Sequence, residues 1–273
     1  MRLKLSLSKS LQQNASDYFG RGKAAKKKLE GLAEAEMAIG KRIASLEKKM
    51  LGLSAESEKL QPSKKRKKDW FEAFHWFFSS DNFLVIGGRD AKSNETAIKK
   101  HMRPADRFFH AEVFGAPHCV VKCESGSAPE QTLGEAAIFA ASFSKAWEQK
   151  LSSVDVYSAS PEQVSKSAKS GESIGKGAFM VYGDRQWFRK TPIGLSIGVE
   201  KTDNGLRVVS GPDAAMKKRA AFSVMLRQGA MQKSDCAKKI LSEFEKRFGR
   251  KCVALDEIMS MLPNGGIEVK SGN

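Results

Sequence analysis

Apolar residues in the first sixty positions recur at alternating intervals of four and three, from position 11 to position 60. This spacing is the heptad repeat of a left-handed coiled coil. Gly22, Glu36 and Ser57 interrupt the seam and predict weak or bent places, because glycine costs about 1 kcal/mol in a helix relative to alanine. We therefore expect a helical arm whose seam needs a second helix, either folded back from residues 52–70 or supplied by another chain. The alternative is a helix lying on the globular body, but lysines flank the seam on both sides.

The helical pattern ends at Gln61-Pro62-Ser63, because proline cannot continue a helix and biases the residue before it away from helical geometry. This break predicts a coiled-coil arm at 1–62 and a globular domain at 63–273. Beyond it, short strand patterns occur at 83–86, 108–110, 119–122, 155–157, 178–182, 195–199, 206–209 and 222–226. Helical patterns occur at 94–101, 131–150 and 233–248, with a last turn at 256–261. The mixture has no strict βαβ rhythm, so we expect an α+β fold with a mixed or largely antiparallel sheet, preceded by the N-terminal coiled-coil helical arm.

Local turn signals refine this expectation. Gly183-Asp184 predicts a hairpin between 178–182 and 186–188, and residues 203–205 predict one between 197–200 and 206–209. Thr132, with Glu135 three residues later, predicts a capping box at the start of the second helix.

Six aromatic rings follow the cations Lys67 and Lys68 within nine residues: Trp70, Phe71, Phe74, Trp76, Phe77 and Phe78. Rings beside cations can stack on bases while neutralising phosphates, which suits single-stranded or structured RNA. The alternative for each single ring is a place in the hydrophobic core. Trp70, on the charged flank, is the ring that we expect to stack, whereas Trp147 follows an alanine-rich helix and should be core.

Charge separates the two parts of the chain. The net charge of +16 is concentrated at the start, where residues 1–68 carry 18 Lys and Arg against 7 Asp and Glu. A basic arm on a milder body suits polyphosphate partners, because released counterions favour association. An anionic membrane surface is disfavoured, since the apolar stripe of the arm is narrow and interrupted.

Composition is globular, with 41% hydrophobic and 29% charged residues in 273. No run is long enough for a membrane span, and the first eight residues are too short and too charged for a signal peptide, so we expect a cytoplasmic protein. The cysteines at 119, 123, 236 and 252 show no CxxC spacing. Reduced core cysteines are therefore expected, without a metal site or a cofactor.

Gly87-Gly88-Arg89-Asp90 lies between a strand pattern and a helix pattern, so its glycines could let the backbone approach a phosphate. The spacing matches no nucleotide-hydrolysing loop. Arg89 could contact a phosphate or a base edge, while Asp90 orients it or caps the helix through Asn94. A structural Arg-Asp pair that fixes the turn is the alternative.

His110 and Glu112 share one face of an extended strand, which could suggest an acid/base or metal site. No third strong ligand is spaced nearby, and we expect His110 to make a polar contact to ribose or backbone. Lys122 ends the next strand and can reach the same surface. Lys166 and Lys176 lie in polar, flexible segments that suit phosphate contacts, although loop lysines are usually only solvated.

The aromatic segment also resembles the RNA-binding (NFACT-R) domain of the NFACT family, the ribosome-quality-control factors. Short blocks that resemble the family follow in family order: Asn94-Glu95, Met102-Arg103-Pro104-Ala105-Asp106, His110-Ala111-Glu112, Gly115-Ala116-Pro117, Val120-Val121-Lys122, Ser144-Lys145-Ala146-Trp147, Asp155-Val156-Tyr157, Pro161-Glu162-Gln163-Val164-Ser165-Lys166, Lys176-Gly177-Ala178-Phe179, Gly211-Pro212 and Leu262-Pro263-Asn264-Gly265. The first residues, with Asn14-Ala15 and Tyr18-Phe19, resemble the coiled-coil start of the family. The resemblance covers nearly the whole chain, and its specificity lies in the order of the blocks.

The resemblance implies a non-catalytic factor that binds the large ribosomal subunit and tRNA in the rescue of stalled ribosomes. The chain looks like only the coiled coil and the RNA-binding domain, without the family's N-terminal domain. It therefore implies either a separate chain that carries that domain or a reduced form that only binds, and the coiled coil could also form a homodimer. The enzymatic alternative is RNA processing by His110, Glu112 and Arg89, although no nucleophile motif supports it. A surface adhesin is disfavoured by the missing signal peptide. The candidate RNA-binding residues are Lys67, Lys68, Trp70, Arg89, Asp90, Asn94, His110, Lys122, Lys166 and Lys176, with no catalytic residue among them.

Overall fold

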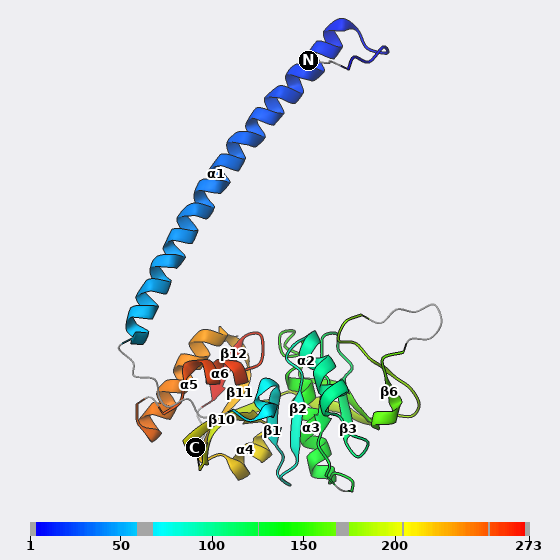
Figure 1. Ribbon diagram of the computed structural model, residues 1–273, viewed down its shortest axis with the longest axis vertical. Coiled ribbons are helices and arrows are strands. Elements are labelled where there is room, and N and C mark those ends of the chain that lie inside the picture. The colour runs from blue at the N-terminus through cyan, green and yellow to red at the C-terminus, as the bar shows by residue number, and fades with distance from the viewer. Residues whose placement is uncertain are drawn as a thin grey trace. The chain divides into compact units, whose positions relative to one another are not determined.

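A computed structural model describes residues 4–58, 68–124, 126–167, 175–203, 205–250 and 252–270, except for the side chains of 48–58. The chain divides into two compact units, Met1–Lys65 and Arg66–Asn273. The first unit is built on one helix and the second is an α+β domain (Figure 1).

Helix α1, Leu11–Glu58, has 48 residues and is about 72 Å long at 1.5 Å per residue. It runs without interruption through Gly22, Gly31 and Gly40, where an added Cβ would meet nothing within 4 Å. Residues 52–58 of the stretch 52–70, which was expected to fold back as a second helix, lie inside α1 instead, and residues 59–67 of that stretch lie outside the described residues. The proline break and Lys67 fall in residues 59–67, which lie outside the described residues.

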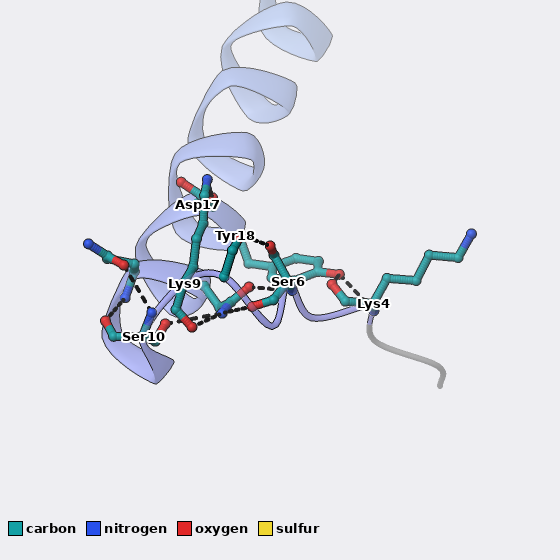
Figure 2. Close-up of polar contacts among 9 residues, drawn as sticks. Lys4, Ser6, Lys9, Ser10, Asp17 and Tyr18 are labelled. Carbon is teal, nitrogen blue, oxygen red and sulfur yellow. Dashed lines mark hydrogen bonds and ion pairs between the residues drawn. The ribbon is translucent and has the colours of Figure 1, made fainter.

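The residues before α1 fold back along its first turns (Figure 2). The side chain of Asn14 accepts a hydrogen bond from the Ser6 N–H at 2.9 Å and donates to three carbonyl oxygens between residues 6 and 10. The Tyr18 hydroxyl donates to the Lys4 carbonyl at 2.8 Å and accepts from the Lys4 N–H at 3.0 Å. Asn14 and Tyr18, which belong to the family-like start of the arm, therefore hold a polar cap on the helix.

The second unit contains a six-stranded sheet within the described residues. Its order is β1-β2-β4-β3-β5-β8, and every pairing in it is antiparallel. The strands are β1 (His75–Phe78), β2 (Leu84–Gly87), β3 (Arg107–Ala111), β4 (Cys119–Val121), β5 (Ser153–Ala159) and β8 (Gln186–Pro192). Helix α3 (Glu130–Ser142) packs on this sheet through small buried alanines and Phe139, whose ring lies 4.8 Å from that of Phe77.

A second sheet has the order β10-β9-β11-β12 among the residues that the structure describes. Its strands are β9 (Leu195–Thr202), β10 (Gly205–Gly211), β11 (Phe222–Met231) and β12 (Ile267–Lys270), again all antiparallel. The helices beside it are α4 (Asp213–Arg219), α5 (Lys233–Phe248) and α6 (Leu255–Met261) (Figure 1). The two sheets meet at β1 and β10, where a Cβ added at Gly211 would lie 2.9 Å from the Phe77 side chain.

The remaining elements are short. They are the 3-10 turns η1 (Trp70–Ala73) and η3 (Pro161–Gln163), helix α2 (Ala91–Thr96), which continues as the π-helical turn η2 (Ala97–His101), and the two-stranded ladder of β6 (Val164–Ser165) and β7 (Met180–Val181). The expectation of an α+β fold with a largely antiparallel sheet, preceded by a helical arm, is confirmed.

Several local predictions are confirmed and others are wrong. Helix α5 has the expected bounds, and β9 and β10 form the expected hairpin. The hairpin at Gly183-Asp184 is wrong, because β7 pairs with β6 while β8 pairs with β5. The helix expected at 131–150 ends at Ser142, and turns carry the chain onward to the buried side chain of Trp147, which is core as expected.

The capping box of α3 is also wrong. Pro129 precedes the helix, while Thr132 and Glu135 are buried and point to the turn between β1 and β2. Thr132 Oγ1 donates to Asp81 at 2.8 Å, and Glu135 accepts from the Ser80 N–H at 2.9 Å. Thr132 and Glu135 therefore bind the hairpin of β1 and β2 instead of capping α3. Buried polar side chains need hydrogen-bond partners, and the turn of this hairpin supplies them.

Candidate nucleic-acid interface

The aromatic segment divides its rings between core and surface. Phe71, Phe74, Trp76 and Phe77 are buried, whereas the Trp70 side chain is 48% exposed. Asp69, just before η1, accepts a salt bridge from Arg207 of β10 at 3.0 Å, and its N–H donates to Glu72 at 3.0 Å. The core alternative therefore holds for most rings, and Trp70 has the exposed position that stacking requires.

Trp70 stacks on His101, the last residue of η2. The ring centroids are 4.4 Å apart and the planes differ by 8°, while Phe74 contacts both rings edge-on. Burial, and then the charges of Lys122 and Lys100, lower the pKa of His101. The imidazole is therefore neutral at pH 7 and acts as a flat support for the indole.

Two hollows border Trp70. The smaller, of about 260 Å³, is lined by Trp70, Lys100, His101, Arg103 and Lys122. The larger, of about 1020 Å³, shares three of these residues and has an aromatic lining; it is bordered by Trp70, Phe71, Phe78, Asn82, Phe83, Leu84, Arg103, Pro104, Ala105, Asp106, Lys122, Cys123 and Glu124. We call the two hollows together the Trp70 groove. An aromatic lining with cations at its edge can hold a base and the phosphates beside it.

Lys122 lines the groove, but protein acceptors occupy its ammonium group. Its Nζ donates to the His101 carbonyl and forms a salt bridge with Asp106, whose side chain is 1% exposed. Asp106 also accepts from the N–H groups of Arg103 at 2.7 Å and Cys123 at 2.9 Å. Lys122 thus holds together three segments that line the groove, and its predicted RNA contact stays a prediction.

Arg89 contacts backbone acceptors. Its guanidinium donates to the Phe74 carbonyl at 2.8 Å and to the Glu72 carbonyl at 3.3 Å, which ties the end of η1 to the end of β2. Asp90 caps α2 through the Ser93 N–H at 2.7 Å, so the expected cap through Asn94 is wrong. These contacts match the structural alternative for the turn, although Arg89 binds carbonyls where an Arg-Asp pair was expected.

Asn94 and His110 meet around His118. Asn94 Oδ1 accepts from the His118 N–H at 2.9 Å, and the rings of His110 and His118 lie 4.9 Å apart. The Nδ1 atom of His110 is 3.2 Å from the Pro117 carbonyl. Burial lowers the pKa of His110, opposed by the Pro117 hydrogen bond and assisted by Arg185.

The remaining candidate lysines lie near α2. Lys166 donates to the Gly175 and Ala178 carbonyls at 3.0 Å, and its ammonium lies 5.1 Å from the centre of the Phe179 ring. Lys176 is exposed. Together with the hydrogen bond from Lys99, which is the largest cause, the charges of Lys166 and Lys176 lower the pKa of Glu95 in α2.

Gly177 explains how this loop reaches α2. It has φ +79°, and an added Cβ would lie 2.6 Å from the backbone of Ala91. Only glycine combines this backbone conformation with so close an approach. The loop that carries Lys176 therefore packs directly on the start of α2.

The candidate RNA-binding residues thus form two groups, one at each end of the segment that α2 and η2 form together. Asn94, His110, Lys166 and Lys176 gather around the start of α2, whereas Trp70 and Lys122 gather at the end of η2. Lys68 is exposed just before Trp70. The sequence patterns did not predict Lys100, His101 and Arg103 as site residues, although all three line the Trp70 groove. Arg103 belongs to the family-like block 102–106, which is the one sequence signal that could have identified it.

These contacts do not assemble His110, Glu112 and Arg89 into the catalytic site that the enzymatic alternative requires. Arg89 bonds to carbonyls of η1, and His110 to a carbonyl near His118. Strand β3 ends at Ala111, and Glu112 beyond it is exposed. Across the described ranges, no three His, Cys, Asp or Glu side chains converge as metal ligands. All four cysteines are free thiols, and three of them are buried.

No described helix combines the length and the apolar character that crossing a membrane requires.

Most residues of the Trp70 groove lie in a segment of known kind: residues 73–183 match the NFACT protein RNA binding domain, and Trp70 and Phe71 come shortly before that segment. The chain thus contains an RNA-binding domain, and it belongs to the NFACT family. It is 37% identical over 216 residues to the archaeal Rqc2 homolog aRqcH of Methanocaldococcus jannaschii, an alignment that covers 78% of this chain and 31% of that protein.

Two animal relatives extend the comparison. Identity is 37% to the ribosome quality control complex subunit NEMF homolog of Drosophila melanogaster, over 67% of this chain and 18% of the relative. It is 38% to the ribosome quality control complex subunit NEMF of Homo sapiens, over 64% of this chain and 16% of the relative. The chain therefore spans a third or less of the length of these relatives.

Proposed function

We propose that this chain is a non-catalytic RNA-binding factor in ribosome-associated quality control, which binds the large ribosomal subunit and tRNA. The family domain and the names of the relatives support this role. The observation that carries the RNA-binding part is the exposed Trp70 ring, stacked on a neutral imidazole at the edge of an aromatic groove.

Trp70 is suited to hold an unpaired base. One face of the indole is supported by His101 at a stacking distance of 4.4 Å, so the ring is already ordered before RNA arrives. Preorganisation of this kind lowers the entropy cost of binding. Lys100 and Arg103 border the same hollow and supply charge for the phosphates that flank the base.

The lysines near α2 extend the interface. Lys92, Lys99 and Lys100 are exposed on α2 and η2, and Lys176 is exposed in the loop that packs on the start of α2. We infer that an RNA strand lies along this helical segment, with a base at Trp70 and phosphates at the lysines. Such contacts make affinity fall steeply with salt.

The test is RNA binding by the full chain and by Trp70→Ala. Stacking on one aromatic ring contributes about 1 to 3 kcal/mol, so the variant should bind a tRNA or an unpaired oligonucleotide about 5- to 150-fold more weakly. Phe114→Ala is the matched control, because Phe114 is 87% exposed with Lys145 at 5.0 Å and lies outside the Trp70 groove. Equal losses for both variants, or an affinity that does not change between 50 and 200 mM salt, would contradict the proposed interface.

RNA turnover separates this function from the enzymatic alternative. The purified chain should leave bound RNA intact with and without divalent metal. Cleavage that disappears in His110→Ala while binding persists would favour the enzyme instead.

A further inference from the structure

The apolar seam of α1 is open to solvent along its described length, except at Tyr18, which is half-buried beside the residues that fold back before the helix. Seam side chains are between half and four-fifths exposed: Leu11, Leu29, Leu32, Ile39, Ile43 and Leu46. The residues before the helix continue the apolar surface, because the cap held by Asn14 and Tyr18 leaves Leu5 and Leu7 exposed. A single helix with such a stripe gains its stability from packing against another helix.

The positions that flank the seam carry mostly positive charge. With Leu11 and Leu32 at d and Leu29 and Ile43 at a, the charged e and g positions between 11 and 47 are Arg21, Lys26, Lys28, Arg42 and Glu47. In a coiled coil these positions face the partner helix and decide which partner binds. Four cations and one acid therefore border the open seam.

Because of this positive charge, a second copy of α1 is a poor partner for the seam. In an antiparallel pair, g faces g, so Arg21, Lys28 and Arg42 would meet each other's copies. In a parallel pair, Arg21 would face Lys26 of the other copy, and only Arg42 and Glu47 would attract. Between residues 11 and 47, Asp17, Glu30 and Glu34 do not offset these repulsions, because they occupy the outward c, b and f positions.

We propose that α1 pairs with a helix from a different protein, whose seam is apolar and whose flanking positions carry Asp or Glu. Glu36 occupies an a position inside the seam. A polar residue at one a position selects a register, so the partner helix places a cation or another hydrogen-bond donor opposite Glu36. The proposal concerns the arm alone and does not depend on the Trp70 groove.

Two designed peptides test the charge complementarity. Both are helical heptad peptides with the same apolar seam and with lysine opposite Glu36, and they differ only in having Glu or Lys at every e and g position. The full chain should sediment as a monomer and bind the acidic peptide at least tenfold more tightly than the basic one. A chain that dimerises through the arm, or that binds both peptides equally, overturns the proposal.

Two triple variants separate recognition at the seam from the overall positive charge. Arg21→Glu, Lys28→Glu and Arg42→Glu reverse the flanking charges, whereas Lys23→Glu, Lys27→Glu and Lys41→Glu make the same change in net charge at outward b and f positions. The flank variant should reverse the preference between the peptides, and the outward variant should keep it. If both variants change the preference alike, the acidic peptide recognises only net charge and the proposal fails.

A seam variant completes the test. Leu32→Asp with Ile43→Asp should abolish peptide binding and leave RNA affinity unchanged, because these changes lie on α1 and not at the Trp70 groove. Peptide binding that survives both substitutions would show that the seam is not the docking surface.

Discussion

Replacement of Lys122 by methionine should destabilise the globular unit instead of only weakening RNA binding. Lys122 is the charged partner of Asp106, whose side chain is 1% exposed, and its own side chain is 16% exposed. Removing one member of a buried ion pair costs about 3 to 5 kcal/mol, because the other charge stays buried without its partner. The N–H groups of Arg103 and Cys123 still bind Asp106 at 2.7 and 2.9 Å. The loss should therefore lie near the lower end, at about 3 kcal/mol.

Urea unfolding followed by tryptophan fluorescence measures this loss. All four tryptophans belong to the unit Arg66–Asn273, so the signal reports that unit and not the arm. A loss of about 3 kcal/mol moves the midpoint by about 1 to 3 M urea, given slopes of 1 to 3 kcal/mol per molar. Lys176→Met is the matched control, because Lys176 is exposed and its replacement should change stability by less than about 0.5 kcal/mol.

A double-mutant cycle identifies the cause. If the penalty arises from the uncompensated Asp106 charge, Asp106→Asn should cost much less in the Lys122→Met background than in the native chain. A loss below about 1 kcal/mol for Lys122→Met, or additive effects in the cycle, would refute the buried-pair reasoning. Lys122 would then be better regarded as a free cation at the Trp70 groove.

Three further predictions follow from single contacts. Burial is the largest cause that lowers the pKa of His118 to about 3. Since the unfolded pKa is about 6.5, the contribution of His118 to stability should be full above pH 6.5 and fall by about 2 kcal/mol by pH 5. His118→Gln should remove that part of the pH dependence in urea unfolding at each pH, whereas the part from His75, whose pKa burial lowers well below its usual value, should remain. An unchanged slope would contradict this assignment. Gly177→Ala should lower stability by about 1 to 2 kcal/mol through strain at φ +79° and a clash with Ala91, with an unchanged midpoint counting against the close approach. Asn14→Ala should release the cap on α1 and speed amide exchange at Ser6 while the helix persists, and equal protection of Ser6 in both chains would disprove the hydrogen bonds between Asn14 and Ser6.

Local patterns predicted the elements whose signals lie within a few residues. The heptad spacing predicted the long helix, and α5 has its expected bounds because its amphipathic period persists over 16 residues. The β9–β10 hairpin could be predicted from the sequence because its turn contains Gly205, which has a positive φ that glycine adopts readily. Each of these elements is stabilised by contacts that are near in sequence, so its own segment contains the information.

The wrong local predictions share a physical cause, which is that groups distant in sequence compete for the same residues. Thr132 and Glu135 have the spacing of a capping box, yet they bind the turn at 79–82, more than fifty residues away in sequence. The hairpin expected at Gly183-Asp184 does not form, because β8 completes the large sheet beside β5. Sequence spacing indicates which local contacts a residue can make. It does not indicate which distant group the residue contacts in the folded chain.

The candidate interface divides in the same way. The sequence by itself determined the family, through the ordered blocks, and predicted an RNA-binding surface, through cations next to aromatic rings. The charged flank also indicated Trp70 as the ring outside the core, and its exposure agrees with that expectation. Only the tertiary structure decided which ring supports it, since the stack with His101 joins residues 31 positions apart. Likewise, the ammonium of Lys122 is directed to Asp106 by burial, which makes an unpaired charge costly wherever the fold excludes water.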